Sequence, residues 1–355
     1  MAVHRQLHSR ITELEDGSGR CFSSTEDYLK LATNYFISLF SASEMGLDDH
    51  VFGLVEKKVA ESMNESLLKA FLEEEIVSAV KMMEPLKVPG VNGFPVMFLQ
   101  RYWHIIGPKI SSYCLSILRR ESQFQDINRT HIVLLPKVEK PRFLSQFCPI
   151  SLCTVMYKIV AKVVVNRMST ILGEVIDEAQ GAFIPGRLIS DNVLIAYEIF
   201  HSLKRKKTGN TGNFALKLDM SKAYDRVEWD FLAGMMTKLD FHTDWVVLVM
   251  RCVCSVSYSV SLNGDCGKWF SPSRGLRQGD PLSPYLFLIC AEGFSTLLVE
   301  EKQKGLMKGA PIGRERLSIN HLFFTNDCIL FGDASYEGAC VVRDVIREYE
   351  MISGQ

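Results

Sequence analysis

The chain has 355 residues, of which 47% are hydrophobic and 23% are charged, and its net charge is −1. These proportions exclude a disordered or fibrous protein and predict a globular chain with two or three subdomains. The balanced charge also excludes a global attractive field for nucleic acid, so any nucleic-acid site has to be a local basic groove.

The cysteines and the hydropathy pattern narrow the class further. The ten cysteines contain no C-x-x-C pair, which argues against a zinc site or a disulfide framework and favours a reducing compartment. The first residues lack the apolar core of a signal peptide. The most apolar stretch, residues 285–299, contains Glu292 and is too short to cross a bilayer, so we expect no membrane partner.

The first part of the chain is predicted to be mainly helical. Apolar residues recur at helical spacing in the segments 26–42, 65–86 and 98–120, and a turn cluster lies at 88–93.

Two further elements and a connector come next. Residues 131–138 form a β-rich run that Pro136 closes, and residues 151–172 have the pattern of a long amphipathic helix. The basic, glycine-containing connector 204–213 is predicted to be a solvated loop, with contact to phosphate groups as the alternative.

After the connector, a predicted strand ends on an acidic residue. Apolar residues alternate over 214–218, and Asp219 follows directly. Asp225 and Glu228 have the spacing of a capping box, which predicts that Asp225 caps the next helix. Alternation over 258–262 predicts another strand, turned by Asn263-Gly264.

The last third is predicted to contain a helix, a hairpin and a second helix. The first helix is expected from Pro281 to near Gly305, and the second at about 337–352. Between them, HLFFTNDCILF (321–331) has the pattern of two short strands joined by a tight turn, in which Asn326 would tolerate positive φ. The order of elements predicts an α+β sheet with helices packed on one face.

Two carboxylates are predicted to meet at one edge of this sheet. If the strand at 214–218 pairs beside the hairpin, Asp219 and Asp327 lie within a few ångströms of each other. Clustered carboxylates repel unless cations lie between them, and Mg²⁺ prefers such oxygen ligands. Two Mg²⁺ ions can stabilise the attacking and leaving oxygens of a phosphoryl transfer. The alternative is that Asp219 caps a turn and Asp327 is a solvated hairpin residue.

The loop at 274–284 combines residues that suit a nucleotide. Its glycines allow close backbone approach, its arginines suit phosphate, and Gln278 suits base or sugar edges. The loop directly precedes a predicted helix N-terminus, where backbone N–H groups favour anions. A glycine-rich turn with a purely structural role is the alternative.

Six segments, in order, resemble the motifs of one family. KLDMSKAYDRVEWDFL (217–232), RGLRQGDPLSPYLF (274–287) and HLFFTNDCILF (321–331) are similar to the three palm motifs of a reverse transcriptase. Residues 131–152 and 180–194 resemble its finger motifs, and residues 88–107 its N-terminal extension. The version is similar to that of plant LINE-type, non-LTR retrotransposons, and it covers the chain from about residue 12 onward.

The resemblance implies an α+β right-hand polymerase with fingers and a palm, whose ferredoxin-like or RRM-like sheet carries helices on one face. It implies a helical N-terminal extension over 1–87, fingers with a linker over 88–213, and an incomplete palm over 214–355. We expect the thumb to be absent, because in the family it follows the position of Gln355.

The resemblance also assigns roles to single residues. Asp219 and Asp327 would be metal ligands and would form the catalytic set with position 326. The nucleotide-binding residues would be Lys137 at the triphosphate, Cys148, Met220 through its carbonyl group, Tyr224 as steric gate against a 2′-hydroxyl, Gln278 and Gly279. The nucleic-acid-binding residues would be Arg187, Arg274 and Arg277.

Two positions depart from the family pattern. Asn326 stands where the family has the first Asp of aromatic-x-Asp-Asp, and an amide cannot bridge two Mg²⁺ ions as a carboxylate can. Cys148 stands where the family has an Arg that grips the triphosphate. Losing one transition-state charge contact corresponds to roughly a thousandfold or more in rate, so this copy is expected to be inactive or nearly so.

The implied function is RNA-directed DNA synthesis in the nucleus, with an RNA template, a DNA primer, deoxynucleoside triphosphates and two Mg²⁺ ions. Three alternatives stay open. The chain is a non-catalytic nucleic-acid-binding remnant or domesticated copy, a gene fragment whose core folds poorly, or a group II intron maturase, which would need a helical splicing domain.

Overall fold

The computed structural model describes residues 10–43, 49–91, 93–205, 212–312 and 317–355. The chain forms two compact units: unit 1 comprises Met1–Ala42, Ala70–Val165 and Leu248–Ser283, and unit 2 comprises Ser43–Lys69, Asn166–Val247 and Pro284–Gln355. The predicted boundaries after residues 87 and 213 do not coincide with this division, because residues 166–213 belong to the same unit as most of the expected palm. The three-part division stays a prediction. Most of the predicted connector, residues 206–211, lies outside the described residues.

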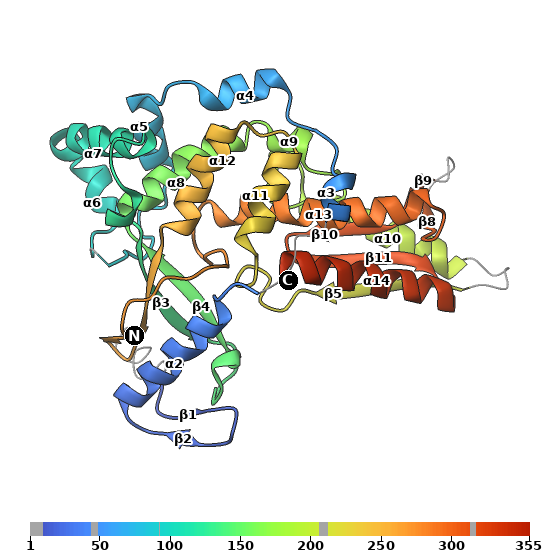
Figure 1. The fold of residues 1–355 in the computed structure, drawn as a ribbon, viewed down its shortest axis with the longest axis horizontal. Helices are drawn as coiled ribbons and strands as arrows, with labels where there is room; N and C mark the ends of the chain where they lie inside the picture. The colour runs from blue at the N-terminus through green and yellow to red at the C-terminus, as the bar shows by residue number, and fades with distance from the viewer. Residues whose placement is uncertain (1–9, 44–48, 92, 206–211, 313–316) are drawn as a thin grey trace. The chain divides into compact units, whose positions relative to one another are not determined.

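The sheet of unit 1 has four strands in the order β4-β3-β6-β7 (Figure 1). β3 (Arg129–Pro136) pairs antiparallel with β4 (Phe147–Cys153) and parallel with β6 (Ser257–Leu262), so the sheet is mixed. Asn263 and Gly264 both have positive φ, 54° and 98°, and turn the chain into β7 (Asp265–Cys266). The predicted Asn-Gly turn is therefore confirmed.

Helices and short elements complete unit 1. They are β1 (Leu14–Glu15), β2 (Cys21–Phe22), α2 (Thr25–Leu39), α5 (Glu73–Met82), α6 (Val96–Arg101), α7 (Trp103–Leu118), η1 (Phe124–Asp126) and η2 (Leu144–Gln146). α8 (Val155–Met168) and α12 (Thr243–Cys254) belong partly to each unit.

Three predicted helices differ from the observed ones. The segment 65–86 is divided, because Lys69 is extended after α4 (Glu61–Leu68) and α5 starts only at Glu73. The segment 98–120 is divided at Tyr102, which ends α6 and precedes α7. The segment 151–172 begins inside β4, whose side chains alternate between buried and half-buried up to Cys153, and its helix α8 starts at Val155.

The strand predicted at 258–262 forms, but the predicted sheet is wrong. The sequence placed it in the sheet of the hairpin, whereas β6 pairs with β3 in unit 1. The reason is packing, because Tyr258 and Val260 share one apolar core with Phe36 and Phe40. The rings of Phe40 and Tyr258 have centroids 5.1 Å apart.

The sheet of unit 2 contains the predicted hairpin and the predicted strand before it. Its order is β10-β11-β5, with β10 (His321–Phe324), β11 (Asp327–Asp333) and β5 (Asn213–Asp219), and both pairings are antiparallel. β8 (Ala310–Ile312) and β9 (Leu317–Ile319) form a separate pair. The helices are α3 (Asp49–Leu54), α4, α9 (Leu172–Val175), α10 (Ile189–Arg205), α11 (Trp229–Lys238), nearly all of α13 (Ser283–Gln303) and α14 (Tyr336–Ser353).

Helices pack on both faces of this sheet, so the expectation of helices on one face is wrong. On one face, Phe323 stacks on Phe294 of α13 with centroids 5.6 Å apart. Leu322 and Phe331 belong instead to a core with Ile199 of α10. Because neighbouring strand residues point to opposite faces, α13 and α10 lie on opposite sides, and Figure 1 shows the helices around the strands.

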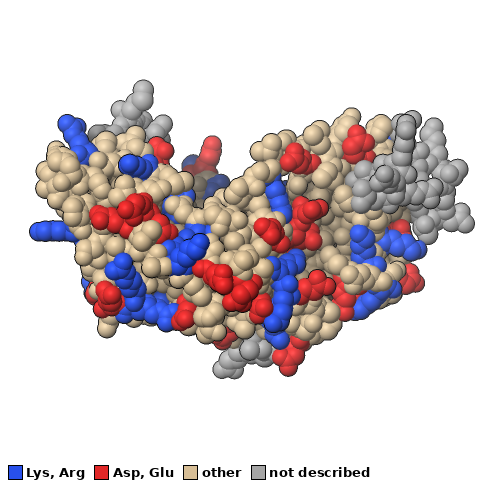
Figure 2. Space-filling model, turned by 90° about the horizontal axis from the view of Figure 1, so that it is seen from above, with Lys and Arg blue, Asp and Glu red and all other residues tan. Residues whose placement is uncertain are grey.

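The described surface carries both signs of charge. Figure 2 shows Lys and Arg interspersed with Asp and Glu over the face in view, in keeping with the net charge of −1. Within the described ranges, none of the helices is both long and apolar enough to pass through a membrane.

Candidate active site

The pairing of β5 with β11 places two carboxylates side by side. Asp219, the last residue of β5, is directly opposite Asp327, the first residue of β11, and both are exposed. Side chains opposite each other in an antiparallel pair point to the same face, with Cβ atoms about 4.5–5.5 Å apart. The predicted meeting of these two residues at one edge is therefore confirmed, while their role as metal ligands stays a prediction.

A lysine that the sequence reasoning missed lies on the same face. Lys217 precedes Asp219 by two residues, and its Nζ lies 3.1 Å from Asp327 Oδ1. Both side chains are more than half exposed, at 68% and 51%, so the pair contributes less than about 1 kcal/mol to stability. Its effect is local, because the ammonium group offsets the repulsion between the carboxylates. The sequence did contain a signal for this neighbour, because residues two apart in a strand, such as Lys217 and Asp219, point to the same face.

The turn between β10 and β11 contains two residues. Phe324 pairs with Asp327, which leaves Thr325 and Asn326 as the loop. Thr325 has the positive φ of 57°, so the expectation that Asn326 would occupy this conformation is wrong. A left-handed backbone is unfavourable for a β-branched residue, and Thr325 persists in it because its N–H donates to Gln180 Oε1 at 3.0 Å.

Tyr224 and Met220 follow β5. The Tyr224 ring is half-buried and stacks on Phe287 of α13, with centroids 4.8 Å apart. Burial raises the pKa of Tyr224 to about 12, so its hydroxyl stays protonated at neutral pH. Met220 is the residue directly after the strand end at Asp219.

The predicted helix cap at Asp225 is wrong. α11 begins at Trp229, its N-cap residue is Glu228, and no side chain caps it. Asp225 is buried in the preceding turns, where its N–H donates to the Lys222 carbonyl at 2.9 Å.

Arg187 makes internal contacts in unit 2. Its Nη1 donates to the carbonyl groups of Asp177 and Gln180, at 2.5 and 2.9 Å. Its Nη2 donates to those of Gly173 and Ile176, at 2.9 and 2.8 Å. The guanidinium group therefore holds the segment after α9 together, and its contact with nucleic acid stays a prediction.

In unit 1, three residues assigned to the nucleotide lie together. Cys148 Sγ donates to Gln278 Oε1 at 3.0 Å, and the Ser151 N–H donates to the Gln278 carbonyl at 2.8 Å. Gly279 has φ of 96° and lies so close to β4 that a Cβ would be 3.4 Å from the Ser151 carbonyl oxygen. Lys137 is exposed beyond β3, and its N–H donates to the Gln146 carbonyl at 2.8 Å.

The arginines of the same loop are held inside unit 1. Arg277 is only 4% exposed; its Nη2 lies 2.7 Å from Asp280 Oδ2, and its guanidinium lies 4.0 Å from the centroid of the Tyr157 ring. The Tyr157 hydroxyl donates to Asp280 at 2.8 Å. Burial raises the pKa of Tyr157 well above its ordinary value. Arg274 Nε donates to the Leu39 carbonyl at 2.8 Å. These contacts fix the loop, and nucleic-acid contacts by the two arginines stay predictions.

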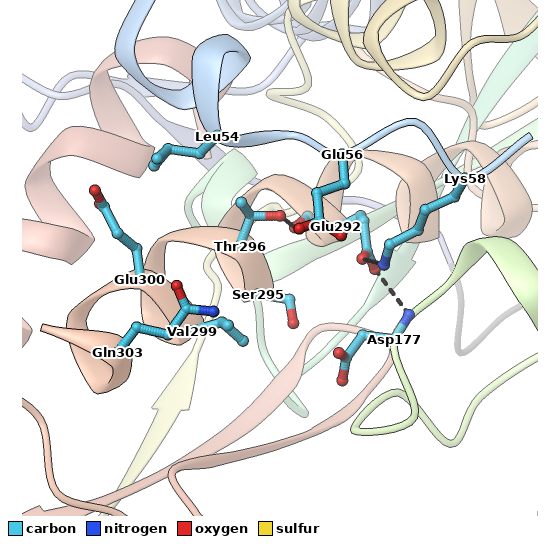
Figure 3. Close-up of a pocket in the computed structure, with 10 residues that line it drawn as sticks. All are labelled: Leu54, Glu56, Lys58, Asp177, Glu292, Ser295, Thr296, Val299, Glu300 and Gln303. Carbon is cyan, nitrogen blue, oxygen red and sulfur yellow. Dashed lines mark hydrogen bonds and ion pairs between the residues drawn. The ribbon is translucent and has the colours of Figure 1, made fainter. Parts of the chain in front are cut away.

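A polar pocket of about 210 Å³ lies elsewhere in unit 2 (Figure 3). Lys58 Nζ lies 2.5 Å from Glu292 Oε1, and Glu292 Oε2 accepts from the Asp177 N–H at 3.0 Å. Burial raises the pKa of Glu292 above its usual value, although Lys58 opposes the shift. Glu292 interrupts the apolar pattern of α13 because it joins two distant segments to that helix.

The oxygen atoms of the side chains at the sheet edge are the type of ligand that Mg²⁺ prefers. Among the described residues, no group of three or more His, Cys, Asp or Glu side chains is arranged to hold a metal ion. Mg²⁺, however, is commonly bound by one or two carboxylates together with water and substrate phosphates. Asp219 and Asp327 are two exposed carboxylates on one face, and Asn326 adds an amide beside them.

The comparison with protein families identifies the class. The model of the family "Reverse transcriptase (RNA-dependent DNA polymerase)" matches residues 136–351, which is more than half of the chain. The matched segment includes the residues described above from Lys137 to Asp327. The chain belongs to this family.

Its relatives include non-LTR retrotransposon proteins. It is 32% identical over 272 residues, 77% of the chain, to the transposon TX1 149 kDa protein of Xenopus laevis. It is 26% identical over 229 residues, 64% of the chain, to the Pol polyprotein of the retrotransposable element R2DM of Drosophila melanogaster. The chain spans 20% of each of these relatives. A shorter match, 43% identical over 75 residues, covers 21% of the chain and 62% of an uncharacterized mitochondrial protein of Arabidopsis thaliana.

Proposed function

We propose that the chain is the reverse transcriptase region of a plant-type LINE retrotransposon, and that its ancestral activity is RNA-directed DNA synthesis. The observation that carries the proposal is the register that sets Asp219 opposite Asp327, inside the segment that matches the family. A carboxylate pair at an exposed sheet edge is the arrangement that nucleotidyl transfer needs to gather divalent cations. The template would be RNA, the primer DNA, and the site of action the nucleus.

Each residue of the site has a role in this proposal. Asp219 and Asp327 would hold Mg²⁺ together with the Met220 carbonyl group, and bound Mg²⁺ would offset charge on the reacting oxygens. Tyr224 would lie under the incoming sugar and exclude a 2′-hydroxyl, for which its stacking on Phe287 supplies a rigid support.

The residues of unit 1 would bind the nucleotide. Gln278 and Gly279 would contact the nucleotide and the template strand, and Lys137 would neutralise the triphosphate. The exposure of Lys137 supports its role, since it leaves the ammonium group accessible to a ligand.

We further propose that this copy is catalytically impaired. Asn326 removes one negative charge beside Asp327, and Cys148 offers no guanidinium for a triphosphate. The contact of Cys148 Sγ with Gln278 Oε1 supports the second point, because the thiol also engages a side chain that the nucleotide would need.

Primer extension on an RNA template with Mg²⁺ tests the proposal. We expect no detectable product from the natural chain, detectable product from Asn326→Asp, and a further gain from Asn326→Asp with Cys148→Arg. The control adds Asp219→Asn to the double variant, which should abolish synthesis. Robust synthesis by the natural chain would contradict impairment, and synthesis that survives Asp219→Asn would contradict the site.

A second candidate function is nucleic-acid binding without catalysis, which the amide at Asn326 favours. Its signature would be salt-dependent affinity for RNA in all variants, with no synthesis by any of them.

A further inference from the structure

The hairpin that carries Asp327 is supported from its other edge by a short segment, residues 179–182. The Phe323 N–H of β10 donates to the Ala179 carbonyl at 2.8 Å, and the Gly181 N–H donates to the Phe323 carbonyl at 2.9 Å. Gln180 and Phe323 thus form a parallel bridge. This supporting segment continues the sheet of unit 2 beyond β10, on the side opposite β5.

The Gln180 side chain reaches from this segment to the tip of the hairpin. The residue is only 2% exposed, and its Oε1 accepts from the Thr325 N–H at 3.0 Å and from the Ala182 N–H at 3.1 Å. The first bond holds the residue of the turn that has φ of 57°. Burial makes the carboxamide immobile, so the bond fixes the position of the Thr325 backbone.

A second donor anchors β10 just before the turn. Asn192 of α10 donates from Nδ2 to the Phe323 carbonyl at 2.7 Å, so this oxygen accepts both from Asn192 and from the Gly181 N–H. Gly181 leaves room for this contact, because a Cβ there would lie 2.8–2.9 Å from the Asn192 carboxamide. Arg187 in turn holds the carbonyl groups of Asp177 and Gln180, which fixes the supporting segment itself.

We propose that Gln180 is a positioning residue for the cation site. Its carboxamide holds the Thr325-Asn326 turn so that the side chains at positions 326 and 327 present their oxygens beside Asp219. The inference rests on the proposed function, because it takes the Asp219–Asp327 edge as the site of divalent cation binding.

The position of the turn matters because Mg²⁺, and Mn²⁺ used in its place, need accurately placed oxygen ligands. Mg²⁺ requires near-ideal octahedral geometry, so a small displacement of Asp327 weakens binding. Without the Gln180 acceptor, Thr325 would lose the bond that stabilises its left-handed conformation and the turn would relax. Because β11 starts at Asp327, directly after the turn, that relaxation would reach the carboxylate.

The test measures Mn²⁺ binding by electron paramagnetic resonance, with the metal alone, in the full natural chain and in Asn326→Asp. Gln180→Met keeps the size of the side chain and removes the acceptor. We expect about tenfold weaker Mn²⁺ binding and faster amide exchange in the peptide 321–331. Gln180→Glu keeps an acceptor oxygen and should restore slow amide exchange in the same peptide.

The matched control is Gln100→Met in unit 1. Gln100 Nε2 donates to the Val80 and Met83 carbonyl groups, both at 2.9 Å, so the variant also loses two hydrogen bonds of a glutamine. It should lower the melting temperature and leave Mn²⁺ affinity unchanged. If Gln180→Met fails to fold, Gln180→Asn, which keeps a carboxamide one methylene shorter, is expected to show the same tenfold loss.

Two outcomes separate the inference from the function on which it rests. Wild-type Mn²⁺ affinity in Gln180→Met, with Asp219→Asn abolishing binding, would overturn the role of Gln180 and leave the proposed function standing. Binding that survives Asp219→Asn would overturn the cation site, and Gln180 would then have no site to position.

Discussion

Lys217 Nζ lies 3.1 Å from Asp327 Oδ1, diagonally across β5 and β11 and on the face that Asp219 shares. The ammonium group therefore occupies the neighbourhood in which a divalent cation would bind. A lysine in this position is a counter-ion for the two carboxylates, and it would compete with the divalent cation that we propose they bind.

Lys217→Met separates these two effects. Without metal, the variant should lose up to about 1 kcal/mol of unfolding free energy, because the carboxylates then repel without compensation. With metal, Mn²⁺ should bind a few-fold more tightly, as measured by titration. Lys308→Met is the control, since Lys308 Nζ pairs with Asp333 at 3.5 Å at the far end of β11. Weaker Mn²⁺ binding in Lys217→Met would contradict the competition.

Thr325→Gly is expected to stabilise the protein by about 1 kcal/mol. Relief of a β-branched residue at φ of 57° gains about 1–3 kcal/mol, and the added chain entropy of glycine removes part of that gain. Thr325→Ala should be intermediate, because it removes the branch and keeps the Cβ. Urea denaturation measures all three chains, and a destabilised Thr325→Gly would show that the turn is not strained.

The sequence predicted the local elements of this site well, for a physical reason. Alternation with a period of two defines a strand and its buried face, and the acidic residue at each strand end then fixes which residues meet across the pair. The turn was less predictable, because the propensity of Asn326 for positive φ was overridden by the Gln180 acceptor at Thr325.

Partners distant in sequence were not predictable. The alternation at 258–262 reports a strand but does not say which sheet it joins, and packing against α2 decided the matter for β6. Gln180 likewise carries no local signal of its contacts, whereas the strand period of two does indicate that Lys217 shares a face with Asp219. The interior role of Arg277 depends on Asp280 and Tyr157, of which only Asp280 is close in sequence.

Breaking the buried pair of Arg277 and Asp280 should be costly. Both side chains are at most 4% exposed, so Arg277→Met leaves a buried carboxylate and should cost about 3–5 kcal/mol in unfolding free energy. Arg277→Met with Asp280→Asn should recover part of the loss. Arg343→Met, which removes an exposed pair with Asp344, should leave stability nearly unchanged, because solvent screens that pair. Equal costs for Arg277→Met and Arg343→Met in urea denaturation would show that burial does not matter here.

His321 is expected to make the fold sensitive to mild acid. Burial lowers its pKa from 6.5 to about 4, and its ring contacts Ser295 Oγ at 2.8 Å and Asn320 Oδ1 at 2.9 Å. As pH falls, the unfolded chain therefore takes up a proton on His321 at a higher pH than the folded chain does. The contribution of neutral His321 to the unfolding free energy is complete above the ordinary pKa of 6.5 and is lost as pH falls toward about 4.

The corresponding variant is His321→Gln. Between about pH 7.5 and pH 5, the natural chain should lose about 2 kcal/mol more unfolding free energy than the variant, because one pKa unit corresponds to about 1.36 kcal/mol. Denaturant titrations at the two pH values measure the unfolding free energy of each chain. The carboxylates are common to both chains, so their effect cancels when the two pH dependences are subtracted. Identical pH dependence would mean that the pKa of His321 is the same in the folded and the unfolded chain.

The register of β5 with β11 joins residues more than a hundred positions apart in the chain. During synthesis, the β10–β11 hairpin can form from neighbouring residues, but Asp219 has no opposite carboxylate until residues 327–333 have left the ribosome. A nascent chain is therefore unable to assemble the Asp219–Asp327 edge before translation of this region is almost finished. A copy interrupted by a stop codon anywhere before β11 would lack this edge, however intact its other motifs.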